Sequence, residues 1–93
     1  MVVGICTIEL HLPESGSLKS KRQILKRIKD RIRNRFNVSL AEVENNDLWQ
    51  RTTLGVAAVA NQGKFVNQVL SQVIEHLHKE SGVVVLDYSM ELW

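Results

Sequence analysis

The spacing of apolar residues changes along the chain, and this change constrains the fold more than any other feature. Residues 2–12 alternate in polarity, and one parity of this stretch carries Val2, Cys6, Ile8, Leu10 and Leu12. A period of two predicts a strand covered on one side. After Pro13, Ser15 and Ser17 are candidate N-caps of a helix. From Leu18 onward apolar residues recur at three- and four-residue spacing, namely Ile24, Leu25, Ile28 and Ile32, which predicts that helix.

The second half of the chain contains the same kinds of element. Residues 37–44 and 50–60 are typical of two strands, and Asn45-Asn46 between them can accept a positive φ. Asn61 is the predicted cap of a second helix, and Gly82 lies just past the predicted end of that helix. The last predicted strand, 83–92, is expected to place one set of residues on one face, namely Val84, Leu86, Tyr88, Met90 and Leu92.

The resulting order is β-α-β-β-α-β, and every element has one apolar face. This order predicts an α+β, ferredoxin-like sandwich in which two helices cover one face of a four-stranded antiparallel sheet. A chain of 93 residues is long enough for one modest core, so residues 1–93 are expected to form a single domain.

Three features predict a cytoplasmic protein without a membrane partner. The first residues, "MVVGICTIEL", have no basic region ahead of their apolar stretch, unlike a signal peptide. Apolar runs such as 83–86 are too short to span a bilayer. Cys6 is the only cysteine, which excludes an internal disulfide and fits a reducing compartment.

Positive charge is concentrated in the first predicted helix. Residues 17–36 hold nine of the twelve Lys and Arg residues and one of the ten Asp and Glu residues, a net +8 that leaves −6 for the rest. Cations three or four residues apart repel one another, and cations near a helix N-terminus oppose the helix dipole. An anionic partner would relieve both costs, so the pattern favours salt-sensitive contacts to the phosphates of RNA. A solvated face, or neutralisation by the acidic remainder of the chain in a homodimer, is the alternative.

Two groups of residues make up the predicted contact surface. Five cations lie within an arc of about 80° on the helix, and they are Lys19, Arg22, Lys26, Lys29 and Arg33. Around the helix start, residues 15–22 offer free backbone N–H groups, the hydroxyls of Ser15 and Ser17 and three cations as a possible cradle for one phosphate or carboxylate, the cations being Lys19, Lys21 and Arg22. The alternative for the cradle is a capped helix start whose lysines point into water.

A second candidate interaction site lies where the third strand begins. Trp49 and Arg51 share a parity there and can form a stacking platform or an interface anchor, although such a Trp can instead close the end of the core. The open-face residues of the two strands expected to be central are Thr7, Glu9, Thr53 and Ala57, and none is aromatic. RNA binding through the sheet, as in RNA-recognition motifs, is therefore disfavoured, and contacts should use the helical side.

Nothing in the sequence predicts catalysis, a cofactor or a metal site. His76 and His78 are two residues apart on a helix and therefore point in different directions, and Cys6 is expected to be buried. Acylphosphatases have this topology, but they require a glycine-rich, arginine-containing loop after the first strand and an asparagine on the third. The loop here is "LPESGSLKSKR", and the third strand has no asparagine. A small-anion enzyme or sensor is thus the weakest of the functions considered.

Several blocks resemble the YlxP-like family of small uncharacterised bacterial proteins, essentially from end to end. They are "SLKSKR" (17–22), "RFNVSLAEVENNDLWQR" (35–51), "TLG" (53–55) and "DYSMEL" (87–92). The resemblance implies a ferredoxin-like fold. It also implies an RNA- or ribosome-associated role, because genes of this family often lie near genes for ribosome maturation and translation initiation. The family has no established catalytic residues, so the expected function is a non-catalytic protein that binds RNA or a ribosomal subunit.

Overall fold

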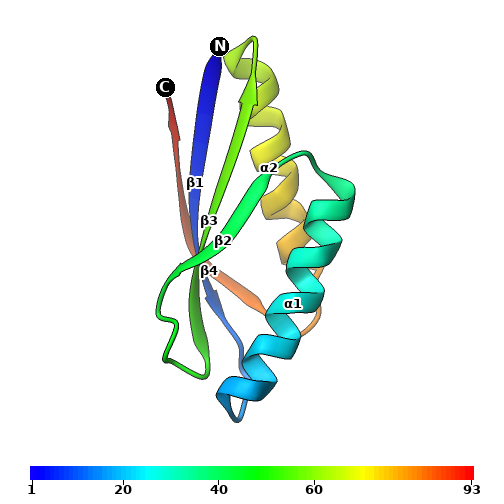
Figure 1. The fold of residues 1–93 in the computed structure, drawn as a ribbon, viewed down its shortest axis with the longest axis vertical. Helices are drawn as coiled ribbons and strands as arrows, with labels where there is room; N and C mark the ends of the chain where they lie inside the picture. The colour runs from blue at the N-terminus through cyan, green and yellow to red at the C-terminus, as the bar shows by residue number, and fades with distance from the viewer.

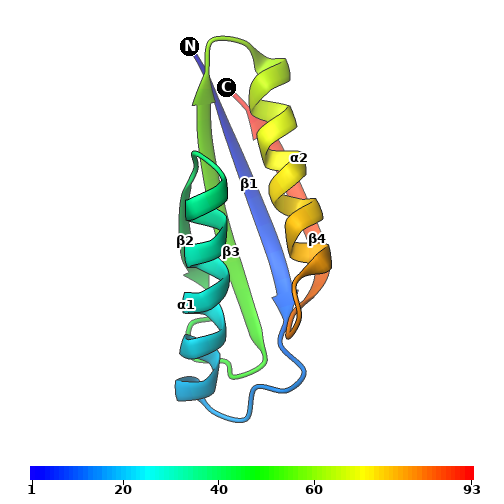
Figure 2. The same ribbon diagram turned by 90° about the vertical axis from the view of Figure 1, so that its right-hand side faces the viewer.

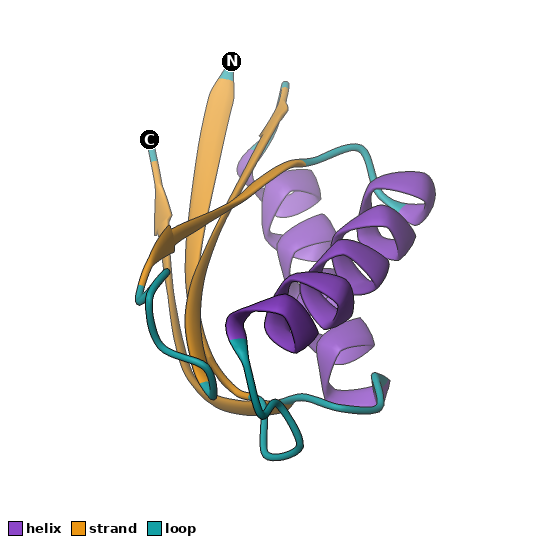
Figure 3. Cartoon of the chain, turned by 60° about the horizontal axis from the view of Figure 1, so that its bottom comes forward, coloured by secondary structure: helices purple, strands orange, loops and turns teal.

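The computed structural model describes residues 1–93 and has six elements. They follow in the order β1 (Val2–His11), α1 (Leu18–Arg35), β2 (Ser39–Glu44), β3 (Arg51–Ala60), α2 (Gly63–Lys79) and β4 (Val84–Leu92). The strands form one antiparallel sheet in the order β2-β3-β1-β4, and both helices lie on the same face of it (Figures 1 and 3). The predicted ferredoxin-like sandwich is confirmed.

The two helices share the cover of the sheet unequally. Helix α1 packs against β2, whereas α2 packs against β1, β3 and β4 (Figure 2). A single cluster of seventeen buried hydrophobic residues fills the space between the layers. Gly4 lets β1 approach α2 closely, because a Cβ at this position would lie 2.1 Å from Val66 Cγ1.

The ends of the helices follow the sequence signals only in part. Ser17 caps α1, and its Oγ accepts a hydrogen bond of 3.0 Å from the backbone N–H of Ser20. The prediction of Asn61 as the cap of α2 is wrong, since the N-cap is Gln62 and its side chain forms no capping bond. After the C-cap residue Glu80, Gly82 adopts a positive φ of 88°, which turns the chain toward β4.

The predicted face of β4 is confirmed for Tyr88, Met90 and Leu92, but it is wrong at the start of the strand because the pairing with β1 is irregular there. The register shifts between Glu9 and Leu10, so that Tyr88 lies opposite Ile8 but Val85 lies opposite Leu10. A bulge of one residue moves all later side chains to the other face of a strand. Val84 therefore lies on the opposite side of the sheet from Tyr88.

The two chain ends lie side by side at the end of the sheet far from the start of α1 (Figure 1). Val3 and Trp93 exchange two backbone hydrogen bonds, of 3.0 and 2.8 Å. The C-terminal Trp93 is thus held in the sheet by its backbone, while its side chain is exposed. Neither α1 nor α2 combines the length and the apolar character that a membrane-crossing helix needs.

Candidate nucleic-acid interface

The cations of α1 are distributed over two flanks of the helix. Arg27, Arg31 and Arg35 recur every four residues on the flank that faces α2, where Arg31 pairs with Glu80. Arg22, Lys26, Lys29 and Arg33 recur on the flank that faces β2, where Arg33 donates to the Leu40 carbonyl at 2.7 Å. Lys19 lies in the first turn, and its side chain is exposed.

Lys21 is not part of the accessible surface, and its prediction as an anion contact is wrong. The residue is 1% exposed, and its ammonium group lies 2.8 Å from a carboxylate oxygen of Glu42. The same group donates to the Asn45 carbonyl at 2.6 Å. Glu42 also accepts a hydrogen bond of 2.5 Å from the Thr52 hydroxyl. Lys21 therefore joins α1 to the β2–β3 hairpin, and its charge is neutralised in the interior.

Most of the other cations of α1 have no carboxylate partner. Of the nine in residues 17–36, only three form ion pairs, which are Lys21–Glu42, Lys26–Asp30 and Arg31–Glu80. Arg27 and Arg33 donate to backbone carbonyls, which satisfy hydrogen bonds but carry no formal charge. The six cations without a carboxylate partner form what we call the basic face, namely Lys19, Arg22, Arg27, Lys29, Arg33 and Arg35.

The only acidic residue of α1 stays ionised within this surface. Asp30 accepts a hydrogen bond of 2.9 Å from Lys26, and this bond holds the pKa of the Asp30 carboxyl below its usual range. The nearby charges of Lys26, Arg33 and Lys29 act in the same direction. Asp30 offsets one cation only, so the exposed part of α1 keeps a large positive charge.

The predicted anion cradle at the start of α1 does not form as expected. Ser15 is fully buried, and its hydroxyl donates to the Ser17 carbonyl at 3.2 Å. The Ser17 hydroxyl serves as the helix cap, and Lys21 is turned inward. Only Lys19 and Arg22 of the predicted cradle cations remain exposed. The local geometry matches the alternative of a capped helix start.

Trp49 is an exposed side chain of the loop 45–50 and does not close the core. Its side chain is 55% exposed, and it lines a shallow hollow of about 440 Å³ with the neighbouring residues Asp47, Leu48, Gln50 and Arg51. Arg51 lies 3.5 Å from a carboxylate oxygen of Glu9 on the open face of the sheet. The structure thus places both predicted interaction residues at the surface, with Trp49 unpaired and Arg51 partly neutralised.

The loop 45–50 is held against the start of α1. Lys21 binds the carbonyls of Asn45 and Asn46, and Asn45 adopts the positive φ expected of it, at 63°. Gln50 donates to the Pro13 carbonyl at 3.3 Å and so ties the loop to the β1–α1 connection as well. The loop 45–50, which carries Trp49, therefore lies at the same end of the molecule as the start of α1 (Figures 1 and 2).

The open face of the sheet is unlike that of a base-stacking sheet. The two central strands are β1 and β3, as expected, and their open-face residues include no aromatic side chain. The Thr53 hydroxyl is bonded to Glu9, and Asp87 lies opposite Glu9 on β4. Exposed apolar side chains also lie on this face, with Val43 beside Gly55 and with Ile5 and Val59 nearer the other end of the sheet.

Cys6 and His76, which carry reactive groups, are both engaged within the fold. Cys6 is 1% exposed, and burial raises the pKa of its thiol to about 11. His76 lies 2.9 Å from Glu80, the same carboxylate that pairs with Arg31.

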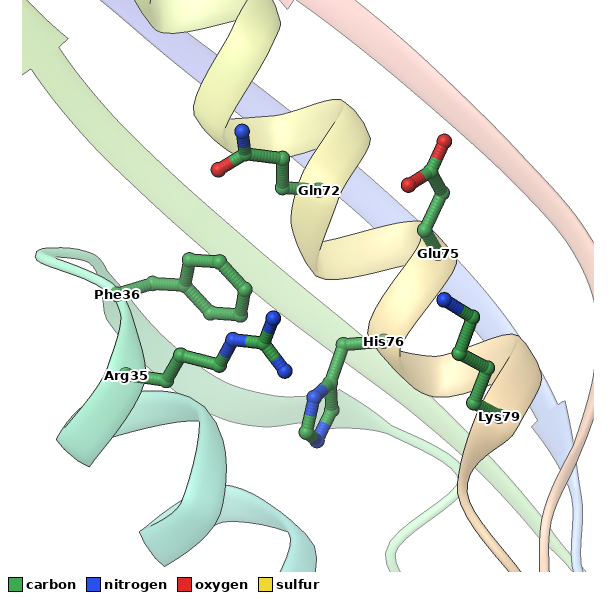
Figure 4. Close-up of a pocket in the computed structure, with 6 residues that line it drawn as sticks. All are labelled: Arg35, Phe36, Gln72, Glu75, His76 and Lys79. Carbon is green, nitrogen blue, oxygen red and sulfur yellow. The ribbon is translucent and has the colours of Figure 1, made fainter.

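A cleft between the end of α1 and the C-terminal half of α2 was not predicted from the sequence. Its volume is about 380 Å³, and its walls are Arg35, Phe36, Gln72, Glu75, His76 and Lys79 (Figure 4). The signal in the sequence is weak. It consists of one aromatic residue directly after the basic helix and polar residues at positions 72, 75, 76 and 79 of α2.

The comparisons with known proteins show the family and the fold. The family described as "Protein of unknown function (DUF503)" matches residues 3–90. The chain is 41% identical over 73 residues to the uncharacterised protein YlxP of Bacillus subtilis, and the match covers 78% of this chain and 79% of that protein.

Two designed proteins share the fold. One is the de novo designed protein Foldit4, which is 9% identical, with coverage of 100% of this chain and 97% of the other and a TM-score of 0.55. The other is a de novo designed protein with a ferredoxin fold, which is 12% identical, with coverage of 100% and 84% and a TM-score of 0.53. These likenesses concern the fold alone.

Proposed function

Because the chain belongs to the DUF503 family, with YlxP as a relative, we propose that it is a non-catalytic RNA-binding protein whose basic face contacts phosphates. A ribosomal subunit is the partner class that the family resemblance suggests, and the cytoplasm is the corresponding compartment. The proposed RNA contact surface is the helical side of the molecule, together with the end of the molecule that carries Trp49.

The observation that carries the proposal is the incomplete neutralisation of α1. Six of its cations have no carboxylate partner, although the chain contains ten Asp and Glu residues that could have supplied one. Like charges three or four residues apart destabilise a helix by a few tenths of a kcal/mol per pair. Oppositely charged pairs at the same spacing stabilise it by a similar amount. Phosphates supply the missing negative charge and release counterions on binding.

The arrangement suits the backbone of folded RNA better than its base edges. The basic face lies on a convex helix, and long Lys and Arg side chains on such a surface reach phosphates without entering a groove. Trp49 adds one exposed ring on the loop that Lys21 ties to α1, and an unpaired base could stack on it. We therefore expect high salt sensitivity and little dependence on sequence.

A titration of a structured RNA with the protein at low and moderate salt tests the proposal. We expect micromolar or tighter binding that weakens as salt increases. The triple variant Lys19→Glu/Arg22→Glu/Lys29→Glu should lose at least tenfold in affinity, because it reverses three cations that have no carboxylate partner.

The chain offers a matched control for a single charge reversal. Arg22→Glu and Lys64→Glu change the net charge equally, but Lys64 lies in the first turn of α2, outside the basic face. Arg22→Glu should weaken binding clearly more than Lys64→Glu. Equal losses would mean that only the net charge matters, and no binding at low salt would reject the proposal.

Self-association is the second candidate, and the exposed apolar residues of the sheet favour it. Ile5, Val43 and Val59 are each at least 41% exposed on the open face, where a second copy could cover them in a symmetric pair. A contact between the acidic sheet of one copy and the basic face of another is different, because it is a head-to-tail contact that builds rings or chains. Sedimentation across a salt series distinguishes the two, since only the charge-driven assembly dissociates as salt increases.

A further inference from the structure

We propose that the cleft between α1 and α2 binds a single nucleotide whose base is not stacked in a helix. The shared chemistry is a planar base linked to a phosphate, and it can come from a free nucleotide or from an unpaired position in RNA. The RNA form of this inference rests on the proposed function, whereas the free-nucleotide form does not.

The walls of the cleft are fixed before any ligand enters. The backbone N–H of Phe36 donates to Ile32 at 2.8 Å, and the Phe36 ring packs against the core. Its ring centre lies 6.0 Å from that of His76, at an interplanar angle of 84°. His76 is in turn held by Glu80. Such support keeps a binding surface in place and lowers the entropy that a ligand loses on binding.

The other polar groups of the cleft have free hydrogen-bonding capacity. Arg35, Gln72, Glu75 and Lys79 form no side-chain hydrogen bond or ion pair, although Glu75 and Lys79 have the spacing of a helical ion pair. Figure 4 shows the Arg35 guanidinium beside the Phe36 ring, with the Gln72 amide on the α2 side of the same ring. These groups are therefore available to a ligand.

The chemistry of the available groups matches the parts of a nucleotide. The Arg35 guanidinium lies 5.4 Å from the centre of the Phe36 ring, and aromatic rings and guanidinium planes are the surfaces on which unpaired bases stack. Gln72 and Glu75 can donate to and accept from the edge of a base. Arg35 and Lys79 outnumber the one carboxylate of Glu75, so a phosphate is favoured. The volume of about 380 Å³ lies within the usual range for ligand cavities.

Two RNA hairpins of equal length, one fully paired and one with a single-nucleotide bulge, test the RNA form. The wild-type protein should bind the bulged hairpin about tenfold more tightly, because a stacked base contributes that much or more. Phe36→Leu keeps an apolar side chain against the core but removes the ring, and it should abolish the preference without changing affinity for the paired hairpin.

A second pair of variants does not depend on the packing of Phe36. Gln72→Ala/Lys79→Ala should also reduce the preference for the bulged hairpin. The control Gln68→Ala/Lys64→Ala makes the same two changes at exposed positions of α2 outside the cleft, and it should leave this preference intact. Equal affinity of the wild type for both hairpins would overturn the RNA form and leave the proposed function standing.

Nuclear magnetic resonance with free nucleoside monophosphates tests the free-nucleotide form of the inference. This test holds even if neither hairpin binds and the proposed function fails. We expect shifts of the Gln72 side-chain amide and of His76 that inorganic phosphate alone does not produce. Shifts without a preference for the bulged hairpin would assign the cleft to free nucleotides. If there is neither a bulge preference nor a shift, or if inorganic phosphate produces the same shifts, the inference is wrong.

Discussion

At the scale of single residues, the ion pairs divide the cations of α1 into structural and available groups. Lys21 and Arg22 are adjacent in the sequence, yet Lys21 is buried against Glu42 while Arg22 is exposed and has no carboxylate partner. Amino-acid composition alone does not distinguish these two cations. The difference arises from their position on the helix, since the side chains of adjacent residues point about 100° apart.

Loss of Lys21 should destabilise the fold far more than loss of Lys19. Lys21→Ala leaves Glu42 and the Asn45 carbonyl without their partner, and breaking a buried pair typically costs about 3–5 kcal/mol. Because the Glu42 side chain is 18% exposed, we expect the lower end of that range. Lys19→Ala should change the free energy of unfolding by less than about 0.5 kcal/mol. Urea denaturation of both variants makes the comparison, and equal values would contradict the structural role of Lys21.

The thiol of Cys6 should make folding stability depend on pH in the alkaline range. Its pKa is raised from 9.0 to about 11 by burial, so the folded state holds the proton more tightly than the unfolded state. Its contribution is complete below pH 9 and is lost as pH rises through 11. Between pH 8 and pH 10 the free energy of unfolding should fall by about 1 kcal/mol from this group. Cys6→Val should remove that part of the decrease in chemical denaturation, and an unchanged decrease would refute the assignment.

At the scale of elements, α1 combines a stabilising cap with destabilising charges. Ser17 caps the helix, yet its first turn contains Lys19 and Lys21 and no acidic residue. Lys21 is compensated by Glu42, whereas Lys19 is not. The helix is therefore held in place by its apolar face and its cap rather than by its surface charges.

Reversing one of these charges should stabilise the isolated protein. Lys19→Glu places a carboxylate near the N-terminus of α1, which should raise the free energy of unfolding by about 0.3–1 kcal/mol at low salt. Ser17→Ala should lower it by about 1 kcal/mol. Thermal or urea unfolding measures both. A loss of stability in Lys19→Glu would mean that this cation serves the fold rather than a partner.

The order of the elements was predictable from the sequence because each has an unbroken apolar pattern. The alternation of β1 and the spacing of Leu25, Ile28 and Ile32 depend only on local periodicity. The bulge opposite Glu9 and Leu10 was not predictable, because it depends on the pairing of two strands far apart in the sequence. The burial of Lys21 was missed for the same reason, since Glu42 and Asn45 lie on another element.

The candidate site was predicted in part. Charge density indicated α1, where Lys19, Arg22 and Arg33 are exposed and Lys29 is half-buried, and their role as phosphate contacts stays a prediction. Trp49 lies on a loop that Lys21 and Gln50 tie to α1 and to the β1–α1 connection, and these contacts are invisible in a single sequence. The cleft at Phe36 requires two helices to be placed together, which periodicity does not specify.

At the scale of the whole molecule, charge and shape separate the two sides. The helical side carries the basic face, and the open sheet carries Glu9, Asp87 and Glu91. An RNA that follows α1 should therefore reach the Trp49 end and stay away from the sheet and from Trp93, which lies at the opposite end of β1.

The two tryptophans allow this orientation to be measured by fluorescence. In the variant Trp93→Phe, the remaining Trp49 should be quenched as RNA is added, since its side chain is exposed on a loop that Lys21 of α1 binds. In Trp49→Phe, the remaining Trp93 should respond little. A stronger response from Trp93 would place the RNA at the wrong end of the molecule for the proposed interface.

The salt dependence of RNA affinity tests the central claim most directly. The logarithm of the binding constant should fall linearly with the logarithm of salt concentration, with a slope set by the number of phosphates neutralised. Replacing Lys19, Arg22 and Lys29 by Gln should make this slope less steep by about 2–3, close to one for each cation removed. An unchanged slope in this variant would show that the basic face does not contact the phosphates.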